Sequence, residues 1–341
     1  MTAAIPDVQR AVQDFLSDAS GGAVTVRALR PLLGGACQDN LRVDAVLASG
    51  EELALVLRSD APGSLPESLR RDDERRVIEA AVAAGVCTPP ARWPSEGLLR
   101  AGAQAYFLDW RDGVAIGRKL VRDEGLAAAR EALPQRLAEE LARIHTITPA
   151  THPQLCEALG DPPDDPAQHA LWATTASLDA LGEPRPALEA ALAWLRAHAP
   201  EASEVTLAHG DFRTGNFLVT PEGLSAVLDW EFARWSTPAE DLAWLCLRDW
   251  RFGRLERPVG GFGERAPFLA AYSEASGRAL TPDALHWWEV LGNVRWAGGS
   301  LHQGRRYLAG ERDLELAAIA RRAGEMEYEA LRLIDRRPTW T

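Results

Sequence analysis

Three oxygen-bearing side chains lie close together in one segment of the chain, between residues 205 and 230. Asp211 and Asn216 are five residues apart, and Asp229 follows after a turn. A tight turn between two short strands makes them antiparallel, so the start of one strand, at Asn216, lies beside the end of the other, at Asp229. Carboxylate and carboxamide oxygens are the ligands that Mg2+ prefers. The spacing therefore predicts a magnesium site at the open end of a hairpin.

This set of side chains is suited to phosphoryl transfer. One carboxylate, Asp211, can orient an attacking hydroxyl and accept its proton, while Asn216 and Asp229 hold the metal ion that neutralises phosphate charge. The step of five residues from Asp211 to Asn216 equals the spacing of the protein-kinase catalytic loop. An Asp in a loop often only caps a turn, but a cap requires neither of the other two residues in register. We therefore expect a phosphoryl-transferring enzyme.

Two motifs in this segment resemble the aminoglycoside phosphotransferase and choline kinase-like family. They are His209-Gly-Asp-Phe-Arg-Thr-Gly-Asn216 and Val227-Leu-Asp-Trp-Glu231, and the resemblance runs from about Leu32 to Ile334. It implies a two-lobed, protein-kinase-like fold of the α+β class, with an antiparallel-sheet N-lobe and a mainly helical C-lobe. It also implies that Asp211 is the catalytic base and that Asn216 and Asp229 bind magnesium.

The resemblance further implies supporting residues around the loop. His209 braces it, Asp241 in the following helix supports it, and His145 ends a helix that precedes it. Arg213 is a second candidate catalytic residue, which either stabilises the transferring phosphoryl group or only pairs with a neighbouring carboxylate. Glu231 either touches a second metal ion or caps the next segment. The sequence leaves both of these choices open.

The N-terminal part offers candidate nucleotide contacts. Gly34 and Gly35 separate two expected strands, so their backbone could approach phosphates, although paired glycines are often a simple turn. Arg58 ends a strand where such kinases place a phosphate-binding lysine, and a guanidinium can still pair with phosphates and with a carboxylate. The Val-Leu-Arg run resembles the kinase-like domains fused to some acyl-CoA dehydrogenases. Glu74 is the favoured partner of Arg58, and Glu79 is the competitor.

The hinge between the lobes is expected at Leu108, Asp109 and Trp110. In the kinases that this sequence resembles, the backbone of the hinge binds the adenine ring. These residues complete the candidate nucleotide site.

The elements that must position these residues divide the chain in two. Strands are expected near residues 24–33, 40–47, 52–57, 97–100 and 105–109, with one helix from Leu69 to Ala84. Helices follow, among them segments near Gln168, from Pro186 to His198, and a final helix from Asp313 to Ile334. We therefore predict a nucleotide-binding lobe over residues 1–110 and a helical lobe over residues 111–341, which carries the catalytic loop and the substrate site.

Composition narrows the class of protein. Hydrophobic residues make up 46% and charged residues 25%, as in soluble globular proteins, and the net charge of -12 argues against a nucleic-acid partner. No stretch approaches the roughly 20 apolar residues of a membrane span. The four cysteines (Cys37, Cys87, Cys156 and Cys246) are too scattered for a zinc site. We expect a cytoplasmic protein, and the sequence does not indicate its oligomeric state.

The expected reaction moves the γ-phosphoryl group of ATP or GTP, with Mg2+, onto a small-molecule hydroxyl. Two acceptor classes are considered: a hydroxy acid or hydroxyacyl-CoA, and an aminoglycoside antibiotic. A catalytically silent nucleotide-binding protein is the alternative of another class, and the intact set of Asp211, Asn216 and Asp229 argues against it.

Overall fold

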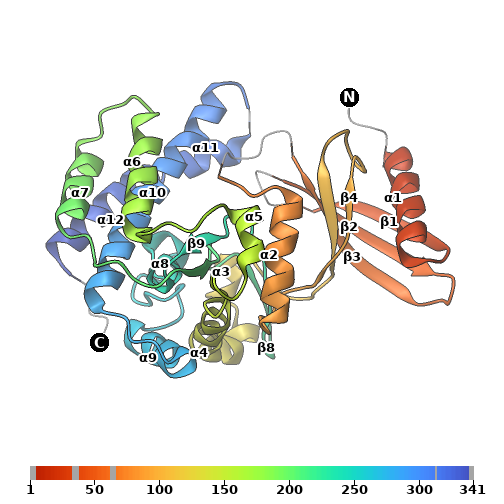
Figure 1. Cartoon of the computed structure of the whole chain (residues 1–341), viewed down its shortest axis with the longest axis horizontal. Helices are drawn as coiled ribbons and strands as arrows, with labels where there is room; N and C mark the ends of the chain where they lie inside the picture. Colours follow the sequence, from red (N-terminus) through yellow and green to blue (C-terminus); the bar gives the residue numbers. More distant parts are fainter. Residues whose placement is uncertain (1–4, 33–37, 62–66, 312, 338–341) are drawn as a thin grey trace.

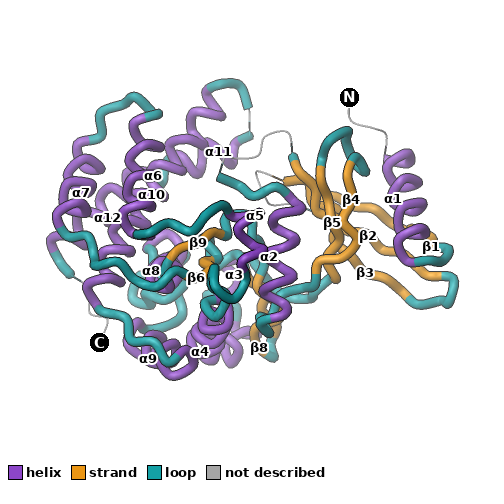
Figure 2. Tube along the Cα trace, viewed as in Figure 1, coloured by secondary structure: helices purple, strands orange, loops and turns teal. Residues whose placement is uncertain are grey.

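The molecule consists of a sheet-bearing lobe and a helical lobe, which lie side by side (Figure 1). The structure is a computed structural model that describes residues 5–32, 38–61, 67–311 and 313–337. Most of the strands gather in the first lobe, and helices dominate the second (Figure 2). The predicted two-lobed α+β class is confirmed. The division at residue 110 falls just after the last strand of the large sheet and remains a proposal.

The N-terminal sheet has the strand order β1-β2-β3-β5-β4, and each neighbouring pair runs antiparallel. The strands are β1 (Val24–Pro31), β2 (Gln38–Leu47), β3 (Glu52–Asp60), β4 (Ala91–Glu96) and β5 (Gln104–Asp109). Alternation along β3 and β5 sends neighbouring side chains to opposite faces. Leu57 pairs with Phe107, and both lie in the apolar cluster under α1 (Ile5–Ser20). Arg58 pairs with Tyr106, whose ring packs in the cluster that contains α2 (Arg71–Ala83).

Helix α1 is absent from the sequence prediction, which placed one helix in this lobe. Val12 and Leu16 are fully buried at a spacing of four residues, and Phe15 stacks on Phe107 with ring centroids 5.8 Å apart. This spacing gives the helix one apolar side, which covers the face of the sheet away from α2 (Figure 1).

The prediction of a strand over residues 97–100 is wrong. The edge strand is β4, and residues 97–103 form a turn closed by a hydrogen bond from Gly97 N to Ala103 O (2.9 Å). Pro94 argues against a strand at this place in the sequence. An edge strand tolerates it, because the register shifts between Arg92 and Ser95 and proline there donates to no neighbour.

The C-terminal lobe is built around the long helix α10 (Pro282–Leu308). The other helices are α3 (Gly117–Leu120), α4 (Ala127–Ile144), α5 (Cys156–Leu159), α6 (Pro166–Asp179), α7 (Pro186–Ala197), α8 (Pro238–Leu245), α9 (Arg265–Ser276), α11 (Leu314–Ala320) and α12 (Ala323–Asp335). Helix α10 contacts α6, α7, α8, α11 and α12, so it carries the core of this lobe. The helices predicted near Gln168 and from Pro186 to His198 are α6 and α7.

The single last helix that the sequence predicts is two helices, α11 and α12. A turn at Arg321 and Arg322 separates them, with Arg322 N donating to Ile319 O (2.9 Å). The apolar spacing continues from Leu316 to Met326 across the turn, which explains why the pattern indicates one helix. No helix of the described residues is long and apolar enough to span a bilayer.

Candidate active site

A short hairpin within the helical lobe sets the spacing of the site. Strands β7 (Phe217–Thr220) and β8 (Gly223–Val227) pair antiparallel, with Phe217 opposite Val227. Leu228 N donates to Asn216 O (2.8 Å), which extends the pairing by one step. Asp229 then adopts a φ of +69°, a left-handed conformation that costs a residue other than glycine roughly 1–2 kcal/mol. The chain therefore turns sharply at Asp229, beside Asn216, as the hairpin argument predicts.

The carboxylate of Asp211 receives hydrogen bonds from three directions. Asn216 Nδ2 donates to Oδ2 (2.7 Å), Trp244 Nε1 donates to Oδ1 (2.8 Å), and Arg213 Nε lies 3.0 Å from both oxygens. Asp211 is 8% exposed, so these donors fix a nearly buried carboxylate. The Arg213 guanidinium also lies over the Trp250 ring, 4.6 Å from its centroid. The sequence left open whether Arg213 stabilises the transferring phosphoryl group or only pairs with a neighbouring carboxylate. The structure shows the pairing, with Asp211.

The loop that carries Asp211 rests on the buried carboxylate of Asp241. His209 N donates to Asp241 Oδ2 (2.7 Å) and Gly210 N donates to Oδ1 (3.0 Å). His145 Nε2 lies 3.3 Å from Oδ2, and its other ring nitrogen contacts Tyr272 Oη at 2.9 Å. Gly210 has a φ of +78°, and a Cβ there would lie 2.1 Å from Phe232 O, so this position requires glycine. The support that the sequence assigned to Asp241 is present.

The His209 ring connects the loop to the segment that leads to Asp229. Its Nε2 donates to Leu228 O (3.0 Å), and its Nδ1 accepts from Asp211 N (3.3 Å). This pattern requires a neutral ring with the proton on Nε2. Burial lowers the pKa of His209 below its usual value and outweighs the nearby carboxylates of Asp241 and Asp211. His209 therefore braces the loop as a neutral side chain.

Arg58 extends from β3 to both the helix α2 and the hairpin. It donates from Nε and Nη2 to the two carboxylate oxygens of Glu74 (2.9 and 2.7 Å), and from Nη2 to Asp229 Oδ1 (2.5 Å). Glu79 instead pairs with Arg75 at 2.6 Å, and its side chain is 52% exposed. Burial alone would lower the pKa of Arg58, but Glu74 above all raises it well above its usual value. The structure thus selects Glu74 over Glu79.

The predicted hinge residues lie at the end of β5 and beyond it. Leu108 pairs with Val56, Asp109 forms an ion pair with Arg92 (2.9 Å), and Trp110 N donates to Ala54 O (2.8 Å). None of the three contacts the Asp211 carboxylate among the bonds of the described residues. Gly34 and Gly35 lie outside the described residues.

A magnesium ion fits the donor set at the mouth of the hairpin. Among the described residues, both side-chain hydrogen bonds of Asn216 use Nδ2, so its Oδ1 keeps its lone pairs for a cation. The Asp229 side chain is 27% exposed, and its backbone follows Leu228, whose N–H donates to Asn216 O. The described residues contain no group of three or more His, Cys, Asp or Glu arranged as a metal cluster. Two protein oxygens completed by water and phosphate oxygens are how proteins commonly bind Mg2+.

Sequence reasoning missed the role of Trp244. Its indole is only 5% exposed, as expected of a core tryptophan, but its N–H is committed to Asp211. A signal was present, because Asp241 and Trp244 lie three residues apart on α8 and so share one side of that helix. A buried indole N–H usually finds a hydrogen-bond acceptor, and the acceptor of Trp244 lies in the loop that Asp241 supports.

Comparisons with known proteins identify a family by sequence and similar folds by structure. A family model described as "Phosphotransferase enzyme family" matches residues 28–287. The structure superposes on a protein from Ralstonia eutropha JMP134 that is provisionally assigned as an aminoglycoside phosphotransferase, with a TM-score of 0.73, 20% identity, and coverage of 94% of this chain and 96% of that one. It also superposes on a choline/ethanolamine kinase family protein from Mesorhizobium loti (TM-score 0.61, 17% identity, 91% and 89% covered).

One curated protein matches by sequence. It is acyl-CoA dehydrogenase family member 10 from Mus musculus, at 30% identity over 207 residues, which are 57% of this chain. The match spans only 18% of the length of that relative, so the chain is similar to one part of a much longer protein.

Proposed function

The chain belongs to the phosphotransferase enzyme family, and from that premise we propose that it moves the γ-phosphoryl group of ATP or GTP to a hydroxyl of a small molecule. The observation that carries the proposal is the junction of Asp211, Asn216 and Asp229. Asn216 bonds the Asp211 carboxylate directly, and its backbone holds Leu228, the residue before Asp229. A base and two metal ligands are thereby assigned to one end of one hairpin.

Each residue has a distinct role in this proposal. Asp211 accepts the proton of the acceptor hydroxyl and orients its oxygen. Asn216 and Asp229 would hold Mg2+, which supplies charge neutralisation on the phosphates when bound. Arg58, which Glu74 holds in place, would contact the same phosphates. Arg213 stays a candidate for contact with the transferred group, because its side chain is 26% exposed beside Asp211.

The nucleotide itself is proposed to bind between the lobes. Gly34 and Gly35 are assigned to the phosphates, and the backbone of Leu108, Asp109 and Trp110 to the base. The Trp110 N–H already donates to Ala54 O, so base recognition there would use the remaining backbone groups.

For the acceptor, we propose a hydroxy acid or hydroxyacyl-CoA. The name of the curated relative supports an acyl-CoA context. Carboxylates near the catalytic loop are also already paired with arginines. Burial alone would raise the pKa of Glu240, but Arg234 and Arg295 lower it to about 2. The carboxylate of Asp249 pairs with Arg322 (2.7 Å). These carboxylates are therefore not available to bind the ammonium groups of an aminoglycoside.

We also propose a cytoplasmic location. Among the described residues, Cys87, Cys156 and Cys246 are free thiols, as is usual in a reducing compartment.

The test is an acceptor screen with a matched pair of variants. Purified protein, ATP or GTP and Mg2+ are mixed with pooled hydroxy acids, hydroxyacyl-CoAs and aminoglycosides, and nucleoside diphosphate release is recorded. We expect release with a hydroxy acid or hydroxyacyl-CoA, lowered about 10²- to 10⁴-fold by Asp211→Asn. Glu222→Gln, an exposed change in the same hairpin, should leave it unchanged. Turnover that survives Asp211→Asn removes Asp211 from the base role, and release with aminoglycosides alone overturns the acceptor class.

A further inference from the structure

Two arginines, not one, bind the carboxylate of Glu74. Arg58 from β3 bonds both of its oxygens, and Arg71, in the first turn of α2, donates from Nη1 to Oε2 (2.6 Å). The Arg71 side chain is 1% exposed and that of Glu74 also 1%. A buried guanidinium requires several acceptors, so the other contacts of Arg71 indicate what it positions.

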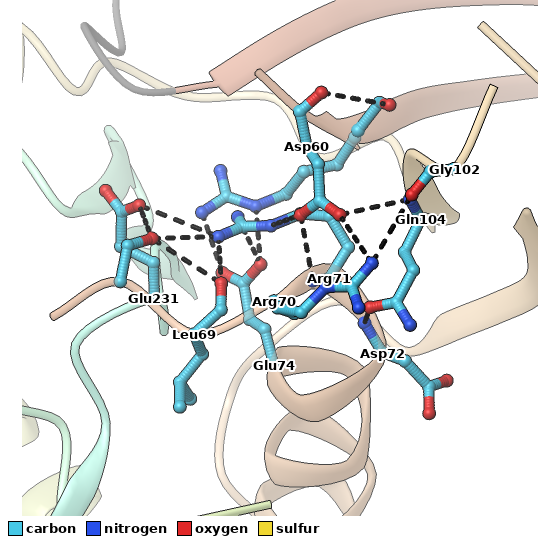
Figure 3. Close-up of polar contacts among 12 residues, drawn as sticks. Asp60, Leu69, Arg70, Arg71, Asp72, Glu74, Gly102, Gln104 and Glu231 are labelled. Atoms are coloured by element: carbon cyan, nitrogen blue, oxygen red, sulfur yellow. Dashed lines mark hydrogen bonds and ion pairs between the residues drawn. The ribbon is translucent and has the colours of Figure 1, made fainter. Parts of the chain in front are cut away.

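Arg71 also reaches toward the helical lobe. Its Nη2 lies 3.7 Å from Glu231 Oε2, and it donates to Ser68 Oγ (3.1 Å) and Leu69 O (2.5 Å). Ser68 Oγ in turn donates a hydrogen bond to Glu231 Oε2 (2.6 Å), so it bridges Arg71 and Glu231. Leu69 N donates to Glu231 O (2.7 Å) as well. Figure 3 shows Glu231 on one side of Glu74 and Asp60 on the other.

The far side of Arg71 is anchored to the sheet through Asp60, at the end of β3. Arg71 Nε lies 3.4 Å from Asp60 Oδ1, and Arg71 N donates to the same oxygen (3.2 Å). Gln104 N on β5 donates to Asp60 Oδ2 (3.0 Å). The start of α2 is thus fixed to the strand that carries Arg58.

These contacts join into a closed circuit, which we call the α2 charge ring: Asp229, Arg58, Glu74, Arg71 and Glu231. Charges alternate along the run of contacts from Asp229 to Glu231. The circuit closes through the backbone between these two carboxylates, because Asp229 and Glu231 are two residues apart. Three carboxylates and two guanidinium groups leave one negative charge in excess. A cation bound at Asp229 would offset that charge.

We infer that Arg71 and Glu231 are positioning residues for phosphoryl transfer, which hold α2 against the Asp229–Glu231 segment so that Arg58 and Asp229 keep their places. This inference rests on the proposed function. It assigns Glu231 to the helix α2 rather than to a second metal ion or to a simple cap. It also gives the first turn of α2 a role that the Arg58–Glu74 pair alone does not require.

The kinetic test uses Arg71→Met and Glu231→Gln, each of which removes charge at nearly constant size. We expect kcat to fall about 10- to 100-fold in each, since a misplacement of about 1 Å can cost 10²-fold. The kcat of the double variant should be no lower than that of the less active single variant, because the two residues act as one unit. Arg71→Lys keeps the charge and should recover part of the loss. Arg75→Met, on the same helix but outside the ring, should match the wild type.

A second readout needs neither acceptor nor metal. Amide hydrogen exchange of residues 67–74 and 228–232 is measured in the nucleotide-free protein. We expect faster exchange in both segments in Arg71→Met and in Glu231→Gln, and no change in Arg75→Met. Faster exchange in only the mutated segment would show that the ring does not couple the two parts.

The two readouts separate failure of this inference from failure of the proposed function. A wild type that neither transfers phosphoryl groups nor binds Mg2+–nucleotide would overturn the proposed function, while exchange still reports on the ring. An active wild type with unchanged kcat in both variants would overturn the inference and leave the proposed function standing. Losses that multiply in the double variant would also overturn it.

Discussion

Beneath the loop that carries Asp211, the Asp241 carboxylate faces the backbone N–H groups of His209 and Gly210, whereas at the start of α2 the Glu74 carboxylate faces two arginine side chains. Both carboxylates are fully buried. The first is satisfied within the helical lobe by these two backbone N–H groups, with the His145 ring 3.3 Å away as its side-chain partner. The second belongs to a ring that spans 171 residues of sequence between Arg58 and Asp229.

The difference teaches how each region should respond to change. Backbone N–H groups cannot move away from a lost acceptor without distorting the loop, so damage under the loop should reach Asp211 directly. Arginine side chains carry several donors and can find other partners, so damage in the α2 charge ring should be graded. Substitutions in the two regions, at Asp241 and in the α2 charge ring, test whether their responses differ in this way.

The largest effect is expected from Asp241→Ala. The change leaves the N–H groups of His209 and Gly210 buried without their acceptor, at about 1–3 kcal/mol each. We expect the free energy of unfolding to fall by roughly 2–6 kcal/mol, with turnover lost in parallel. Urea denaturation measures the first, and a substitution at exposed Glu264 gives the control. A variant as stable as the wild type would remove the contrast between the regions.

A smaller effect is expected from Arg58→Lys. Lysine keeps the positive charge but lacks the planar fork that bonds Glu74 twice and reaches Asp229. Arg71 still neutralises Glu74, so we expect stability to change by less than about 2 kcal/mol while kcat/KM falls roughly tenfold. Steady-state kinetics with varied nucleotide measures the loss. If Arg58→Lys destabilises the protein as strongly as Asp241→Ala, the ring is not the more tolerant region.

The smallest effect is a pH dependence from His209. Burial lowers the pKa of this ring in the folded protein, whereas in the unfolded chain it titrates near 6.5. Below pH 6.5 the ring binds a proton in the unfolded chain but stays neutral in the folded protein. The free energy of unfolding is therefore highest above pH 6.5 and falls as the pH decreases. The slope is at most about 1.4 kcal/mol per pH unit.

The measurement for His209 is the difference in unfolding free energy between wild type and His209→Gln from pH 5 to 8. Because His286 also has a lowered pKa from burial, the wild-type curve alone is insufficient. The difference should shrink toward low pH, since glutamine does not titrate. A difference that is constant with pH would mean that His209 is not held neutral.

Much of the site was predictable because its geometry is local. The hairpin places Asn216 and Asp229 together through a turn of a few residues, and the structure reproduces it. The choice of Glu74 over Glu79 was also within reach. Val77, Ile78 and Ala81 follow Glu74 at three, four and seven residues and are all buried, so Glu74 lies on the inner side of α2.

The remaining features depend on tertiary arrangement. The contact of Arg71 with Glu231 joins residues from different lobes, and no local spacing encodes it. Strand β4 contains Pro94, which is acceptable only because that strand lies at an edge and is bulged. The break between α11 and α12 interrupts an apolar pattern that itself continues.

The central claim is that Asp229 is a magnesium ligand beside the base Asp211. It is tested most directly by thermal stabilisation of wild type and Asp229→Ala with ATP, once with Mg2+ and once with a chelator. Comparing the two conditions within each protein removes the effect of the lost Arg58 contact. At nucleotide concentrations near 100 times Kd, we predict that Mg2+–ATP stabilises the wild type by about 2.7 kcal/mol and that Asp229→Ala loses the Mg2+-dependent part. Equal Mg2+-dependent stabilisation of the two proteins would contradict the account.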